Sequence, residues 1–392
     1  MGVITSSLYW SLPGPKEFAQ KVTDACKNAR VVMLSFPQYL PAPIVIPLEN
    51  ALKDANIYDP AMLNIESGMD ISSQIATHFG EEHMPAQSLS NHVHKAQHAI
   101  VLIAQGSRAQ EQCEKYMHEF TKGMGHATGN VSLIVSIRGG EHQKDEFKDG
   151  IRIISFDGSL RPAEMEAYVS QRMVSYAGPG TTNLYRHLVT EYAAFDATLA
   201  ERLAEMDSSK ILGLPHTLSE ILGENLLRWS QQTWVAGTIC SSSKDVHPLH
   251  EWHRATYSGV DANHFARLVE KRYWRACLKA LMPWMEERRQ GILDMVDRPL
   301  KVLEQSSGHG TIAKRIGSRT IYVPRHELEY NDLVFYATQP EFQSINLTIP
   351  ELKAIEACSA AKTVRDELSH IRPPRVEDIS NLVSRMDYLF PG

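Results

Sequence analysis

The chain has 392 residues, of which 43% are hydrophobic and 22% are charged, and its formal net charge is −6 at pH 7. This composition is that of an ordinary globular protein with room for two domains, and no apolar run reaches the roughly 18 residues that cross a bilayer. The first residues lack the basic start and apolar core of a signal peptide. Five widely spaced cysteines without a C-x-x-C pair exclude a zinc cage of thiolates and indicate reduced thiols, so we expect a cytoplasmic protein.

Four short apolar runs predict buried strands in the first part of the chain. They lie at residues 30–37, 99–104, 131–137 and 151–156, and helices are predicted at 43–54, 109–123 and 162–173. Continuous apolar strands that alternate with helices are typical of a parallel sheet covered on both faces. The sequence therefore predicts an α/β domain over residues 1–177 with a mostly parallel sheet.

This order of elements resembles P-loop NTPase-like domains, including degenerate ones in bacterial multi-subunit ATPase and defence systems. The turn after the first strand, at 35–43, reads SFPQYLPAP. It lacks the glycines, lysine and hydroxyl of a Walker A loop, and its three prolines remove N–H donors. The strand HAIVLIAQG ends without the acidic pair of a Walker B. The resemblance thus implies a fold that does not hydrolyse ATP, and we expect no cofactor; whether the sheet still holds a nucleotide is open.

The rest of the chain, residues 178–392, is predicted to be an all-helical domain with one small β-hairpin. Helices are predicted at 184–206, 218–234 and 262–281, and Pro283 is expected to open the next segment. Residues 311–323 are rich in β-branched residues and have Gly317 and Ser318 at their centre, which predicts the hairpin.

The last long helix is predicted at residues 351–372. Pro350 fits its first turn, and Pro373 and Pro374 stop it. The expected apolar stripe, at spacings of three, four or seven, consists of Leu352, Ile355, Val364, Leu368 and Ile371.

This helix contains the hexapeptide RDELSH, from Arg365 through Asp366 to His370. It resembles the R-x4-6-H motif of HEPN domains, helical bundles found in many metal-independent ribonucleases. It also resembles the RN-x-LAH segments of bacterial helical proteins that cleave nothing. The first resemblance implies that His370 is the acid/base, that Arg365 clamps the phosphate and that Asp366 orients the pair. It also implies a homodimer that brings two motifs together.

Positive charge is concentrated between residues 264 and 325. This segment has 13 Lys or Arg against 6 Asp or Glu, while the whole chain carries −6. Such a segment indicates a phosphate-rich or acidic partner, or else a solvated helix face whose long cationic stems cover apolar surface. The candidate nucleic-acid contacts are Arg267, Lys271, Arg272, Arg275, Lys279, Lys314, Arg315 and Arg319.

A glycine-containing stretch and two histidine pairs match the patterns of binding sites but also have simpler interpretations. Two glycines at 177–183 precede a helix and would suit an anion, but the stretch is also a plain interdomain turn. His94 and His98, and likewise His250 and His253, have the spacing of two metal ligands on one helix face. No third ligand can be named for either pair, so we predict no metal site.

Two functions of different classes follow. In the first, the protein is a non-catalytic scaffold that binds a protein partner and can also contact nucleic acid through residues 264–325. Such a protein resembles accessory or effector subunits of bacterial anti-phage and toxin–antitoxin systems. In the second, it is a metal-independent ribonuclease that uses Arg365 and His370.

Overall fold

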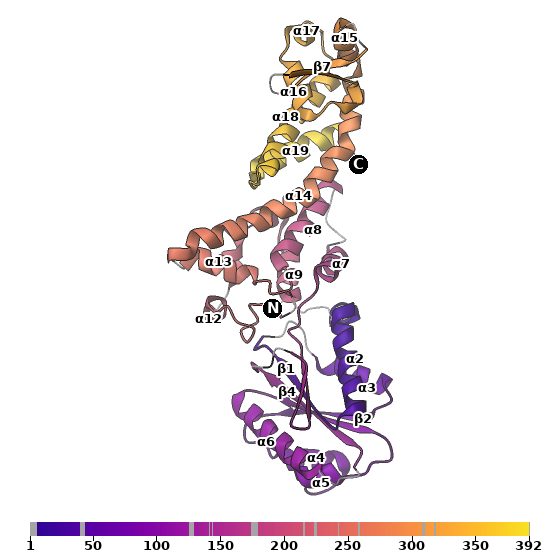
Figure 1. Cartoon of the computed structure of the whole chain (residues 1–392), viewed down its shortest axis with the longest axis vertical. Helices are drawn as coiled ribbons and strands as arrows, with labels where there is room; N and C mark the ends of the chain where they lie inside the picture. Colours follow the sequence, from indigo (N-terminus) through magenta and orange to yellow (C-terminus); the bar gives the residue numbers. More distant parts are fainter. Residues whose placement is uncertain are drawn as a thin grey trace. The chain divides into compact units, whose positions relative to one another are not determined.

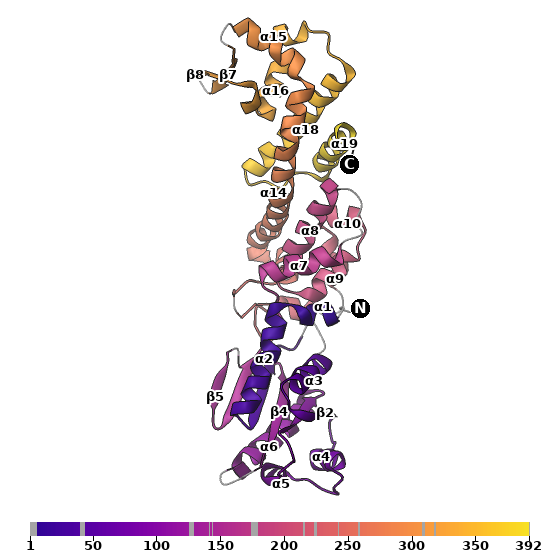
Figure 2. The ribbon, with the colours of Figure 1, turned by 90° about the vertical axis from the view of Figure 1, so that its right-hand side faces the viewer.

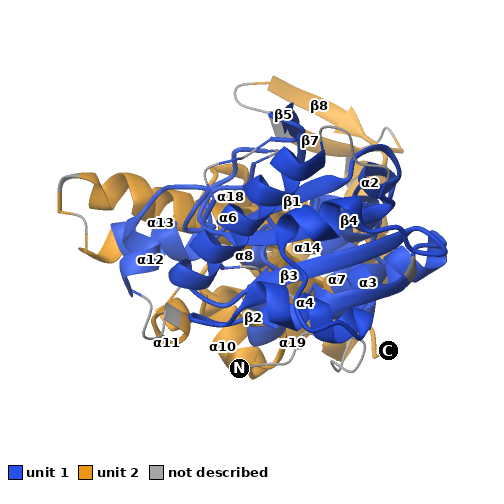
Figure 3. Cartoon of the chain, turned by 90° about the horizontal axis from the view of Figure 1, so that it is seen from below, with its two compact units in different colours: residues 1–168, 193–202, 222–254 blue, residues 169–192, 203–221, 255–392 orange. Residues whose placement is uncertain are grey.

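The computed structural model divides into two compact units, which Figure 3 colours separately. Unit 1 contains residues 1–168, 193–202 and 222–254, and unit 2 contains residues 169–192, 203–221 and 255–392. The chain therefore passes between the units more than once. The structure describes residues 6–39, 44–124, 129–140, 142, 144–173, 179–214, 216–222, 226–241, 243–257, 259–307, 310–316 and 319–391.

The described residues form eight strands and a larger set of helices. The strands are β1 Val31–Phe36, β2 Tyr58–Ile65, β3 His98–Ala104, β4 Val131–Arg138, β5 Glu146–Lys148, β6 Ile151–Ser155, β7 Ile312–Ile316 and β8 Arg319–Val323. The helices up to residue 230 are α1 Ser6–Ser11, α2 Pro13–Asn28, α3 Val45–Asp54, α4 Ile71–Phe79, α5 Ala86–Asn91, α6 Ser107–Gly123, α7 Pro162–Arg172, α8 Pro179–Ala193, α9 Ala197–Ala204, α10 Ser208–Leu212, α11 Ser219–Leu222 and α12 Leu226–Ser230. The later helices are α13 Pro248–Tyr257, α14 Ala262–Met295, α15 Asp297–Ser307, α16 Tyr330–Ala337, α17 Pro340–Gln343, α18 Ile349–Ser369 and α19 Val376–Leu389, with 3₁₀ turns at His216–Leu218, Gly259–Asp261 and Arg325–Glu327.

Unit 1 is built on a six-stranded sheet in the order β2-β3-β4-β1-β6-β5. Every neighbouring pair is parallel except β5 and β6. Helices α2 and α3 cover one face, and α4, α5 and α6 cover the other (Figure 1). The predicted α/β domain with a mostly parallel sheet is thus confirmed.

The central strands are apolar throughout because both faces of the sheet are buried. In β1, Val31 and Met33 enter the core on the side of α6, whereas Val32, Leu34 and Phe36 enter the core on the side of α2. Successive side chains point to opposite faces of a strand, so a strand covered on both sides needs an uninterrupted apolar run. The four predicted strands are β1, β3, β4 and β6 of this sheet.

The sequence did not predict β2 or β5. The strand β2 reads YDPAMLNI, in which Asp59 adopts a positive φ of 40° and Pro60 removes a ladder donor. Proline is tolerated in β2 because this strand lies at the edge of the sheet. The strand β5 has three residues, all exposed, so it carries no apolar signal.

A buried Asp–His contact links two distant segments within unit 1. The Nε2 atom of His247 lies 3.0 Å from a carboxylate oxygen of Asp196, and His247 Nδ1 accepts the backbone N–H of Leu249 at 3.2 Å. Because Nδ1 accepts, Nε2 carries the proton and donates it to Asp196. Although burial raises the pKa of Asp196, the hydrogen bond from His247 and the charge of Arg228 hold it well below its usual range. Both ring nitrogens of His247 are therefore occupied, as in a structural contact.

Unit 2 is helical apart from the hairpin of β7 and β8, which is antiparallel as predicted. The predicted turn at Gly317 and Ser318 lies outside the described residues. Helix α18 packs against α14, α16 and α19, and Figure 2 shows the hairpin beside α16. The hydroxyl of Tyr336 on α16 donates to the carbonyl of Ala313 on β7, which joins hairpin and helix.

Three helix predictions in this half are wrong. The predicted helix at 184–206 is interrupted where Ala194 takes a φ of 53°, and Asp196 then accepts the N–H groups that begin α9. The predicted helix at 218–234 consists of the short α11 and α12. Pro283 does not begin a segment but lies inside the 34-residue α14, where it removes one backbone hydrogen bond. The residues Leu281 and Trp284, on either side of Pro283, are buried, so packing holds the helix together there.

The buried face of α18 differs from the predicted apolar stripe. Val364 and Leu368 are buried as predicted, but Leu352 and Ile371 are exposed. Apart from Glu351 in the first turn, the remaining buried positions are small residues: Ala354, Ala357, Cys358, Ala360 and Ala361. Alanines bring the axes of neighbouring helices close together, because little side chain separates them.

All five cysteines are free and buried: Cys26, Cys113 and Cys240 in unit 1, and Cys277 and Cys358 in unit 2. Burial raises the pKa of Cys26, Cys113, Cys277 and Cys358 to about 12. Among the described residues, no helix is long and apolar enough to span a membrane.

The start of α18 generates the first prediction. Glu351 accepts hydrogen bonds from the N–H and hydroxyl of Thr348 and from Arg298, and the hydrogen bond from Arg298 is the main reason why its pKa falls from 4.5 to about 2. A depressed pKa stabilises the fold above pH 4.5, and this contribution is lost as the pH falls toward 2. We expect Glu351→Gln to cost about 1 kcal/mol at pH 7 and to cost less in acid. Thermal unfolding of both proteins between pH 7 and pH 3 measures this, with Glu270→Gln on the exposed side of α14 as the control.

The end of α18 generates the second prediction. The N–H of Arg372 donates to Glu367 and that of Ile371 to Leu368, which forms a Schellman motif. Its left-handed position is occupied by Ile371 with φ 57°, where a β-branched residue is strained. We expect Ile371→Gly to stabilise unit 2 by about 1 kcal/mol, measured by thermal unfolding. Ile371→Ala keeps the Cβ, so it should retain most of the strain; equal stabilisation by both variants would contradict this explanation.

Candidate functional site

Unit 2 contains a pocket of about 520 Å³ between α14, the hairpin, the turn before α16 and α18. Its apolar part comes from Met282, Met285, Ile321, Val323 and Tyr330. Its charged part comes from three cations, Arg289, Lys314 and Arg365, and three carboxylates, Glu286, Glu327 and Glu329, together with His326. The pocket therefore combines an apolar surface with alternating charges and includes one residue of the predicted motif.

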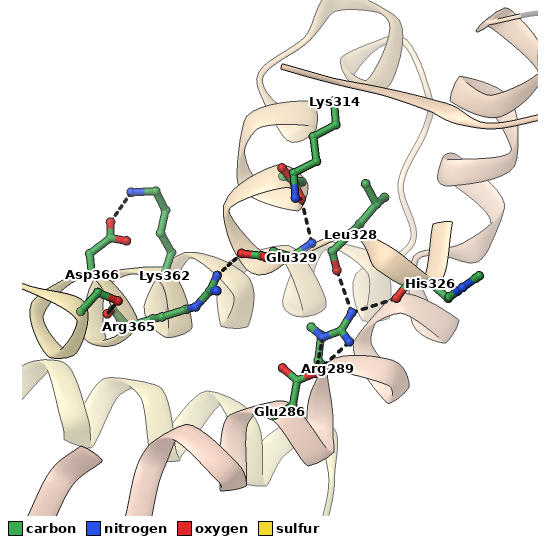
Figure 4. Close-up of polar contacts among 11 residues, drawn as sticks. Glu286, Arg289, Lys314, His326, Leu328, Glu329, Lys362, Arg365 and Asp366 are labelled. Carbon is green, nitrogen blue, oxygen red and sulfur yellow. Dashed lines mark hydrogen bonds and ion pairs between the residues drawn. The ribbon is translucent and has the colours of Figure 1, made fainter. Parts of the chain in front are cut away.

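Arg365 points from α18 toward the beginning of α16 (Figure 4). Its guanidinium donates to the carboxylate of Glu329 in an ion pair. The next residue, Asp366, faces Lys362 on its own helix, and their side chains are 2.8 Å apart. Two of the three residues predicted for catalysis are thus neutralised by partners in the same chain.

His370 occupies a different position from Arg365. It is the C-cap residue that follows α18. Its backbone N–H donates to the carbonyls of Asp366 and Glu367, and its side chain is exposed. It does not line the pocket. Within the described part of the chain, no hydrogen bond joins His370 to Arg365. The structure brings Arg365 together with Lys314, another predicted residue, and not with His370.

Glu329 is the carboxylate that pairs with Arg365 in the pocket. The hydrogen bond from Arg365 lowers its pKa most, and the charges of Lys314 and Arg289 lower it further, against a rise from partial burial. Glu329 also caps α16, because its side chain accepts the N–H of Asp332 while its own N–H donates to Asp332 at 2.8 Å. A single side chain therefore begins a helix and holds the motif's arginine.

The other two cations are fixed by neighbouring groups. Arg289 donates to Glu286 and, through Nη1, to the carbonyls of His326 and Leu328 at 2.9 Å each (Figure 4). Lys314 on β7 lies 2.8 Å from Asp332. Arg289 therefore ties the turn before α16 to α14, and Lys314 ties the hairpin to α16.

Part of the basic segment is neutralised inside unit 2. Arg275 and Lys279 both contact the carboxylate of Glu191, at 2.9 and 2.8 Å, and Arg272 donates to the carbonyl of Glu191. Arg267, Lys271 and Arg319 are exposed and form no ion pair among the described residues. The side chain of Arg315 lies outside the described residues. Internal pairs thus take up part of the excess charge of this segment, and a nucleic-acid interface of these residues stays a prediction.

The carboxyl end of β1, where a P-loop would begin, is covered by other residues of unit 1. The N–H of Gln38 donates to the carbonyl of Val235, and that of Gly139 donates to Phe36, both at 2.8 Å. The guanidinium of Arg228 lies 4.5 Å from the ring centroid of Tyr39. These N–H groups are committed to carbonyls and are not directed at an anion.

The histidine pairs do not form a metal centre in the described part of the chain. His98 stacks on His78, with 3.1 Å between their Nε2 atoms, and its ring is tilted by 36° against that of His94 at a centroid distance of 5.0 Å. His250 bonds through Nδ1 to the carbonyl of Trp229. No group of three or more His, Cys, Asp or Glu among the residues searched could hold a metal ion. Residues 177 and 178 of the glycine stretch at 177–183 lie outside the described residues, and residues 179–183 belong to α8.

Sequence reasoning did not identify Arg289, Glu329 or Tyr330 as parts of the site. Glu329 had a local signal, because an acidic residue followed by Asp332 three positions later is a capping pattern. Glu329 and Arg365 are 36 residues apart in the sequence, so no local sequence pattern predicts their pairing.

Comparison with known proteins adds no relative from which a role could be transferred. No protein-family model matches the chain, and no curated protein matches it.

Proposed function

We propose that the protein is a non-catalytic subunit that binds a protein partner, in a complex of the bacterial defence type. The observation that carries this proposal is the ion pair between Arg365 and Glu329. An arginine that stabilises a transferring phosphoryl group must offer its fork to the phosphate oxygens. Here a carboxylate of the same chain takes that fork, and Lys362 neutralises Asp366 in the same way.

The sheet of unit 1 supports a degenerate P-loop-like domain as the second half of this proposal. Its parallel strands run β6-β1-β4-β3-β2, with β1 between β4 and β6. This order resembles that of a large class of P-loop NTPases, in which the first strand also lies centrally. The residues after β1 supply no lysine, and the N–H groups of Gln38 and Gly139 bond to carbonyls. A docking platform without ATP hydrolysis is the role that fits these contacts.

A nucleic-acid contact is a secondary part of the proposal. Arg267 and Lys271 are exposed on α14, and Arg319 is exposed on β8. Cations outside internal ion pairs are those that can exchange counterions for backbone phosphates.

The alternative is a metal-independent ribonuclease. One observation favours it: α18 ends at Ser369, so His370 is exposed at the helix end and could meet a substrate or a second chain there. Catalysis would require Arg365 to leave Glu329 and His370 to act as the acid or base.

RNA cleavage in EDTA distinguishes the two functions. We expect the purified wild type to leave single-stranded and hairpin RNA intact, with or without added nucleotide, because Arg365 is occupied. His370→Ala should then behave identically, and affinity capture with the intact chain should retain a protein partner.

Cleavage that survives EDTA, produces 2′,3′-cyclic phosphate ends and disappears in both His370→Ala and Arg365→Ala would overturn the proposal in favour of the ribonuclease. Cleavage that persists in both variants would identify a contaminant, and the preparation would be repeated until the wild type gives a clear result.

A further inference from the structure

The pocket of unit 2 has the arrangement of an anion site whose occupant belongs to the same chain. Arg365 bonds directly to Glu329, and the charges of Lys314 and Arg289 act on the same carboxylate. Arg365 is more buried than its partner: the side chain of Glu329 is 44% exposed, against 29% for Arg365, and Lys314 is held separately by Asp332 at 2.8 Å. An incoming anion could therefore replace Glu329 while the cations stay in place.

We propose that the pocket binds a short acidic and aliphatic segment of the partner protein, whose carboxylate replaces Glu329 on Arg365. The inference rests on the function proposed above and names the chemistry of the partner. In the unbound protein Glu329 occupies Arg365. The ligand must displace Glu329, so it binds less tightly than it would to an unoccupied Arg365.

The apolar part of the pocket accounts for the aliphatic side chain. Met282 and Met285 supply flexible, polarisable surface that adapts to a ligand. Ile321, which is 39% exposed, faces Lys314 across the hairpin, so one hairpin face presents an apolar and a cationic group side by side. The volume of about 520 Å³ lies within the range of pockets that enclose small ligands. A few residues of a peptide fit this combination.

The same pocket suits a peptide better than a nucleic acid. Tyr330 is only 2% exposed and its hydroxyl donates to the carbonyl of Met285 at 2.6 Å, so its ring offers no face on which a base could stack. The carboxylates of Glu286 and Glu327 also line the pocket, and they would repel a chain of phosphates. A peptide with one carboxylate and an aliphatic neighbour needs no ring to stack on, and it is repelled less by these carboxylates than a chain of phosphates is.

Fluorescence anisotropy with the full-length protein tests the inference. The probe is a fluorescein-labelled hexapeptide with a single glutamate beside a leucine in an otherwise uncharged sequence, compared with the same peptide carrying glutamine for glutamate and with a labelled hexauridylate. We expect the acidic peptide to bind the wild type, and Glu329→Gln to bind it about 5- to 50-fold more tightly, because an internal competitor has been removed. Gln keeps an acceptor oxygen, so the cap of α16 is retained.

Two further variants make the test specific. Arg365→Ala should weaken the acidic peptide about tenfold or more, because a charge-assisted hydrogen bond is lost. If that variant fails to fold, Arg365→Lys keeps the charge without the fork and should weaken binding to a smaller extent. Glu327→Gln removes the same charge from the same pocket without touching Arg365, so it should change the affinity less than about twofold.

Several results would overturn the inference. They are the absence of acidic-peptide binding by both the wild type and Glu329→Gln, equal tightening by Glu327→Gln and Glu329→Gln, and a response to hexauridylate alone. EDTA-resistant RNA cleavage that requires Arg365 would overturn the proposed function as well. Without such cleavage, a failed peptide test removes only the assignment of the partner's chemistry.

Discussion

Unit 2 depends on the close packing of α18 against α14, α16 and α19. Ala354, Ala357 and Ala361 bring these helices together, and Val364 and Leu368 complete the buried face. Burial of Val364 fixes the rotation of α18, and Arg365 then projects about 100° further around the axis. From there its long side chain reaches the first turn of α16, where Glu329 lies. The position of the motif's arginine is therefore a result of helix packing, and so is the separation of Arg365 from His370.

The fold of unit 1 was largely predictable, because its central strands are buried on both faces and appear as continuous apolar runs. The strand β2 could not be predicted, since Pro60 is acceptable only at a sheet edge and the sequence does not say which strand is at the edge. In unit 2, local rules failed where distant residues decide. Pro283 lies within α14 because contacts along both halves of the helix outweigh one lost hydrogen bond. Helix α8 ends at Ala193, just before Asp196, whose carboxylate bonds to His247, a residue 51 positions away.

The candidate site was predictable only in part, because its electrostatics depend on pairs far apart in the chain. The segment 264–325 was read as a basic patch, yet Arg275 and Lys279 are matched by Glu191, and Arg298 by Glu351. A count of charges along the sequence cannot include partners 53 or more residues away. Arg365 was selected for its spacing from His370, whereas the structure gives it a role through Glu329. The motif located the site but did not identify its chemistry.

The distribution of the buried thiols has a practical consequence for the study of this protein. Three cysteines lie in unit 1 and two in unit 2, and all are protected from solvent. A thiol with a pKa near 12 is almost entirely protonated at neutral pH and reacts slowly with alkylating reagents. Alkylation followed by mass spectrometry of the individual peptides would therefore count opening events separately for each unit. The native chain thus carries its own set of chemical probes for local unfolding, without any introduced label.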